Sequence, residues 1–63
     1  MNQIKPDTAF TNWTVAELRG MYRARVRRLL LLEQDKAPKA LTQRQEAMVK
    51  QSRRLLHNRG IEL

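Results

Sequence analysis

The stretch "WTVAELRGMYRARVRRLLLLEQ", residues 13–34, decides the fold class of this chain. Thr14 precedes an apolar-periodic run and Glu17 follows three positions later. This is the spacing of a capping box, in which each side chain satisfies a backbone N–H of the first helical turn. Trp13 stands where a hydrophobic staple begins. The pattern predicts a helix over 15–34.

A second helix follows after a short break. Pro38, in "DKAPKAL", disfavours helix at the residue before it. Thr42 and Gln45 repeat the capping-box spacing, and Gly60 suits the left-handed position after a helix end. A link this short returns the second helix antiparallel to the first. The predicted elements are a loop over 35–41 and a helix over 43–59.

The residues before the hairpin show no sustained period. Residues 1–13 carry Pro6 and scattered apolar side chains, which predicts an extended arm before a hairpin spanning 14–63. A chain of 63 residues has a small core, and no cysteine is present to form a disulfide. We therefore expect an all-α antiparallel two-helix hairpin with an N-terminal extended arm, completed by dimerisation or by a partner.

Each predicted helix has one apolar face when its residues are placed about 100° apart. Ser52, at the centre of the second face, is small and permits close approach of the first helix. The two faces consist of Val15, Leu18, Tyr22, Val26 and Leu29 on the first helix, and Met48, Val49, Ser52, Leu55 and Leu56 on the second.

The charge balance is strongly basic, with 13 Lys and Arg residues, 6 Asp and Glu residues and a net charge of +7. Such a balance favours DNA, RNA, anionic lipid or an acidic protein surface as partner. A membrane is disfavoured, because the apolar run 29–32 is too short to span one and the second helix covers the apolar face of the first. The absence of cysteine and of a signal-peptide pattern leads us to expect a cytoplasmic protein.

The sequence contains few residues that could form a catalytic site. His57 is the only histidine, and it lies on a predicted polar face. No glycine-rich phosphate loop, nucleophile–base pair or metal-ligand spacing is visible. We expect no enzyme activity, no metal, no cofactor and no small-molecule substrate.

The first functional hypothesis is a small nucleic-acid-binding regulator that contacts phosphates of DNA or RNA through arginine-rich helix faces. Phosphate contacts give affinity with little reading of sequence. A merely solvated, solubilising face is the alternative interpretation of these charges. The candidate nucleic-acid-binding residues are Arg19, Arg23, Arg27, Lys50, Arg53 and Arg54.

The alternative hypothesis is a protein-interaction module, an adaptor or inhibitor that docks on a larger acidic protein. Small residues recur at every fourth position on the first helix and permit close approach of a partner or of the arm. Arg25 projects among core residues, so it either extends past a thin core edge or meets a carboxylate or phosphate across an interface. The candidate residues for a partner or a homodimer interface are Trp13, Gly20, Ala24, Arg25 and Leu31.

Overall fold

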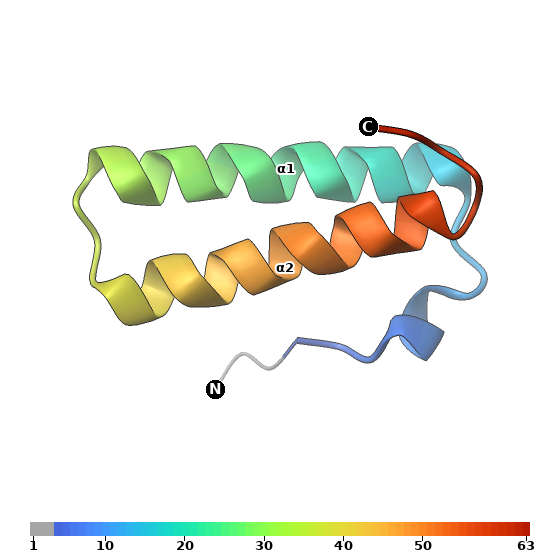
Figure 1. Cartoon of the computed structure of the whole chain (residues 1–63), viewed down its shortest axis with the longest axis horizontal. Helices are drawn as coiled ribbons and strands as arrows, with labels where there is room; N and C mark the ends of the chain where they lie inside the picture. The colour runs from blue at the N-terminus through green and yellow to red at the C-terminus, as the bar shows by residue number, and fades with distance from the viewer. Residues whose placement is uncertain (1–3) are drawn as a thin grey trace.

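The computed structural model describes residues 4–63 and shows an antiparallel pair of packed helices (Figure 1). A 3-10 helix, η1 (Asp7–Phe10), precedes α1 (Val15–Gln34) and α2 (Lys39–His57). This confirms the all-α hairpin with a short N-terminal segment. Residues 1–3 of the predicted arm lie outside the described residues.

The start of α1 is the one that the capping box predicts. The Glu17 N–H donates to the Thr14 hydroxyl oxygen at 3.1 Å, and the Thr14 N–H donates to the Glu17 carboxylate at 2.9 Å. Two of the N–H groups that have no helical partner are thereby satisfied. The helix runs over Val15–Gln34, the predicted bounds.

The predicted start of the second helix is wrong by four residues. Helix α2 begins at Lys39, and Pro38 occupies its N-cap with an extended backbone. Proline excludes helix at the residue before it, yet its missing N–H costs nothing at a helix start, so Pro38 begins the helix instead of delaying it. The Thr42 hydroxyl donates to the Lys39 carbonyl, and Gln45 turns inward, so neither residue caps the helix.

Both helices end in the same hydrogen-bond pattern. The Ile61 N–H donates to the Leu56 carbonyl at 3.0 Å across Gly60, whose φ is +80°. At the end of α1 the Ala37 N–H donates to the Leu32 carbonyl at 2.9 Å across Lys36, which is also left-handed, with φ +52°. These are Schellman endings, in which a left-handed residue turns the chain away from the helix.

Lys36→Gly is expected to stabilise the fold by about 1 kcal/mol, because a Cβ is disfavoured in the left-handed region. The matched change Gly60→Ala is expected to destabilise it by a similar amount, since it adds a Cβ at the equivalent place. Thermal melting followed by circular dichroism measures both, with an expected shift of roughly 4–8 °C in opposite directions. Shifts in the same direction would mean that the left-handed geometry does not determine stability here.

The core of the hairpin is concentrated at the end away from the loop. Phe10, Leu18, Leu55 and Leu56 form the buried cluster there. Toward the loop the apolar side chains are only half-buried, Val26 and Leu29 of the predicted core face among them. Figure 1 shows the two helices diverging toward the loop, in agreement with this gradient. The helices therefore hold each other mainly at one end.

The N-terminal segment is not a free extended arm. Its η1 turn packs against α2, and Phe10 is only 3% exposed. The Phe10 ring meets the Trp13 ring edge-on, with centroids 4.9 Å apart. The sequence shows no period here because a single short turn, not a full helix, buries the phenylalanine.

Candidate nucleic-acid interface

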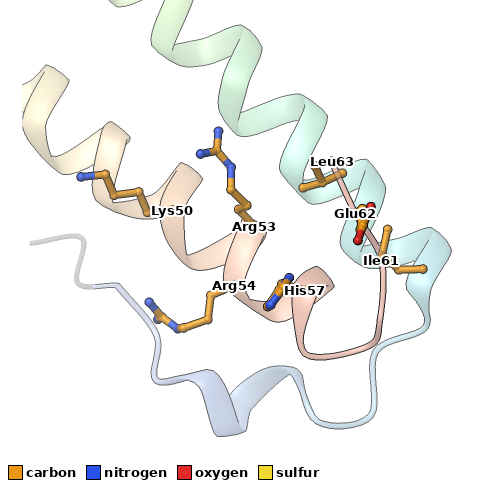
Figure 2. A pocket seen from close by; sticks show the side chains of 7 residues that line it. All are labelled: Lys50, Arg53, Arg54, His57, Ile61, Glu62 and Leu63. Atoms are coloured by element: carbon orange, nitrogen blue, oxygen red, sulfur yellow. The ribbon is translucent and has the colours of Figure 1, made fainter.

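A basic groove lies between the outer face of α2 and the C-terminal tail (Figure 2). Its volume is about 540 Å³, and Glu62 is the acidic side chain on its wall. The lining residues are Lys50, Arg53, Arg54, His57, Ile61, Glu62 and Leu63.

Helical spacing explains why the basic residues of this groove gather. Lys50, Arg53, Arg54 and His57 follow one another at steps of three, one and three residues on α2. Residues three and four apart are neighbours on a helix surface. Ser52 faces the opposite way and is fully buried. The groove is thus the polar back of the same helix whose front packs on α1.

Arg54 is already engaged within the chain. Its Nε donates to Asp7 Oδ2 at 2.8 Å, and a terminal guanidinium nitrogen donates to Asp7 Oδ1 at 2.9 Å. The pair is the only salt bridge among residues 4–63, and it lowers the pKa of Asp7 to about 2, mainly through these hydrogen bonds. Arg54 therefore presents less net charge to an external anion than Lys50 and Arg53 do.

The three predicted arginines of α1 are all exposed, but they do not form one straight row. Leu18 points at α2 and is 1% exposed. At about 100° per residue, Arg19 turns to the side of the hairpin, Arg23 points further outward, and Arg27 points away from α2. Arg19 and Arg23 therefore flank the helix pair, and Arg27 extends from its outer surface.

Arg25 bonds within the hairpin, which explains its place among core residues. One terminal nitrogen donates to Ser52 Oγ at 2.7 Å, to the Met48 carbonyl at 2.8 Å and to Gln51 Oε1 at 3.1 Å. The guanidinium carbon also lies 5.8 Å from the centre of the Phe10 ring, a cation–π distance. Partial burial lowers the pKa of Arg25, but arginine remains charged.

Gln51 links this arginine to the N-terminal segment. Its amide nitrogen donates to the Lys5 carbonyl and to Asp7 Oδ1, the latter at 3.1 Å. A continuous polar network thus runs from Arg25 through Gln51 and Asp7 to Arg54. Sequence reasoning missed this linking role of Gln51 and Asp7, because a glutamine beside an apolar face and an aspartate after a proline carry no distinguishing pattern.

The remaining predicted interface residues do not form one surface, because Gly20, Ala24 and Leu31 share an outer face of α1 and Trp13 lies apart from them. Trp13 packs against the buried cluster, whereas Gly20 and Ala24 are exposed on α1. A Cβ built on Gly20 meets nothing within 4 Å. The N-terminal segment therefore does not pack on the small residues of α1, which was one of the two expectations for them. Leu31 is 45% exposed near the loop.

Two further classes of site are not found in the part of the chain that the structure describes. No group of three or more His, Cys, Asp or Glu side chains is placed to hold a metal ion in residues 4–63. Neither helix in that range is apolar enough over a sufficient length to cross a bilayer.

No protein-family model, curated protein or solved structure matches this chain.

Proposed function

We propose that this chain is a non-enzymatic nucleic-acid-binding regulator that holds phosphates against the basic face of its hairpin. The observation that carries the proposal is the groove on α2, where Lys50, Arg53 and His57 gather without an acidic partner among the hydrogen bonds and ion pairs of residues 4–63. Lys and Arg that neutralise phosphates release condensed counterions, which gives strong salt-dependent binding.

Salt-titrated fluorescence anisotropy with labelled mixed-sequence DNA and RNA tests this proposal. Binding is expected at low salt, with the logarithm of the affinity falling linearly with the logarithm of the salt concentration. The variant Lys50→Glu/Arg53→Glu is expected to weaken binding by at least about tenfold and to reduce the salt slope by about 2. No binding to either polymer at low salt would refute the proposal.

The matched control is Arg28→Glu/Arg44→Glu, which changes the net charge by the same amount. Both of these arginines are exposed, and neither lines the groove. The control is expected to lose less than about threefold in affinity, since it leaves the groove intact. An equal loss in both variants would mean that overall charge, not this face, attracts the polymer. Arg54 is left unchanged because its variants also break the contact with Asp7.

A protein partner or a second copy is the other candidate, favoured by exposed leucines near the loop. Leu30, Leu31 and Leu41 are 55%, 45% and 48% exposed. Sedimentation velocity of the full chain tests the homodimer directly, and Leu30→Ser/Leu41→Ser is expected to shift any dimer toward monomer. A monomer at all concentrations would leave a different protein as the only partner of this type.

A further inference from the structure

We infer that the nucleic acid is a double helix, held across one face of the hairpin by basic residues of both helices. The inference rests on the proposed function and names its ligand class. It is carried by the placement of Arg19 and Arg23 on the same side as Arg53 and His57, together with the absence of an exposed aromatic platform in residues 4–63.

The two helices turn their basic residues to the same side. Leu18 and Ser52 are buried and point at the partner helix, and Arg19 and Arg53 each follow by one residue. In a right-handed helix each residue is rotated by about 100° from the one before it. The two helices run in opposite directions and face each other, so this rotation carries Arg19 and Arg53 to the same side of the hairpin. Figure 2 shows Arg53 on that side, extending from α2 toward α1.

The N-terminal segment occupies the other side. Gln51 precedes Ser52 by one residue and therefore turns the opposite way, where it binds Lys5 and Asp7. The basic side thus remains uncovered by the N-terminal segment. The C-terminal tail crosses one end of it, where Ile61 packs on the buried cluster (Figure 2).

The Phe, Trp and Tyr side chains of residues 4–63 present little free surface on which bases could stack. Phe10 is buried, and Trp13 and Tyr22 pack against its cluster. Proteins that bind single strands rely on aromatic side chains on which successive bases stack. The amides of Gln45 and Gln51 are also bonded within the chain, so neither is available to read base edges. The basic side of the hairpin is therefore suited to contacts with phosphates.

The basic residues of α1 and those of α2 form two groups on one side of the hairpin, and two such groups suit the two phosphate backbones of a duplex. Packed helices lie roughly 8–10 Å apart, and the minor groove of B-DNA is about 6 Å wide. Long arginine and lysine side chains on either helix reach phosphates on either edge of such a groove. A single strand supplies one line of phosphates and engages one group at a time.

The test compares a labelled mixed-sequence 20-base-pair duplex with each of its separated strands, at the same salt concentration and with the full chain. The duplex is expected to bind at least about tenfold more tightly than either strand. The variants Arg19→Glu/Arg23→Glu on α1 and Lys50→Glu/Arg53→Glu on α2 are each expected to weaken duplex binding by about tenfold and to lower its salt slope by about 2.

The control Arg28→Glu/Arg44→Glu matches each variant in charge and lies on the side of the N-terminal segment. Arg28 is ten residues after Leu18 and Arg44 eight before Ser52, steps that turn both away from the basic side. Circular dichroism of each variant is the check that its helices are kept. Equal or tighter binding of single strands overturns the duplex inference while the proposed function stands. Loss of duplex binding from the α2 variant alone overturns the arrangement in two groups. Absence of binding to all probes overturns both proposals.

Discussion

Leu56→Ala is expected to destabilise the protein by about 3 kcal/mol, the cost of removing a fully buried leucine and leaving a cavity. Leu56 is 0% exposed and belongs to the cluster that joins α2 to α1 and to the N-terminal segment. A core of this size supplies only roughly 3–5 kcal/mol in all. Urea unfolding followed by circular dichroism is therefore expected to show a variant that keeps only about 0–2 kcal/mol of stability and unfolds at much lower urea than the unmodified chain.

Leu30→Ala is the matched control for this substitution. Leu30 is 55% exposed, and its truncation is expected to change the free energy of unfolding by less than about 0.5 kcal/mol. The contrast between the two leucines tests whether the stability of the hairpin is concentrated away from the loop. Similar losses at both positions would show that the loop end is packed in solution, for example against another molecule.

Arg25→Met is expected to destabilise the fold by about 2 kcal/mol, or roughly 8–16 °C in melting temperature. Methionine keeps the apolar stem but removes the donor to Met48, Gln51 and Ser52. Gln51 Oε1 then loses its partner at a site where the glutamine is only 3% exposed. An unsatisfied buried acceptor costs more than the bond itself contributes.

Arg23→Met serves as the control, because Arg23 is exposed on the same helix. Its melting temperature is expected to stay within about 3 °C of the unmodified chain. If Arg25→Met instead matched or exceeded the stability of the unmodified chain, the desolvation of the guanidinium would outweigh its hydrogen bonds. The network would then contribute to the arrangement of the segments and not to their stability.

Local signals account for the parts of the fold that the sequence predicts well. Thr14 and Glu17 satisfy each other's backbone within one turn, so their pattern is readable without knowing the rest of the chain. Gly60 likewise marks its own left-handed turn. Lys36 occupies the equivalent place after α1 without a glycine, and nothing in its residue type reveals this.

The features that sequence reasoning missed depend on distant partners. Phe10 is buried by residues more than forty positions away, and Arg25 has its acceptors on α2. Asp7 neutralises Arg54 across a separation of 47 residues. Periodicity identifies only residues that are neighbours along one helix. It therefore predicts which residues form the basic face, but not that Arg54 is already paired with Asp7. For the candidate nucleic-acid interface, the predicted residues are exposed as expected, and the placement of Arg19 and Arg23 on the same side as Arg53 follows only from the antiparallel packing.

The docking of the N-terminal segment on α2 also sets an order of events during synthesis. Residues 5–11 are synthesised before their partners Gln51, Arg54 and Arg59. Until then Phe10 has no surface on which to be buried, and α1 grows without the aromatic ring that faces Arg25. The two helices are joined by a short link, whereas the contact of Asp7 with Arg54 closes a loop of 47 residues, which costs more chain entropy. We therefore expect residues 5–11 to dock after the two helices have paired.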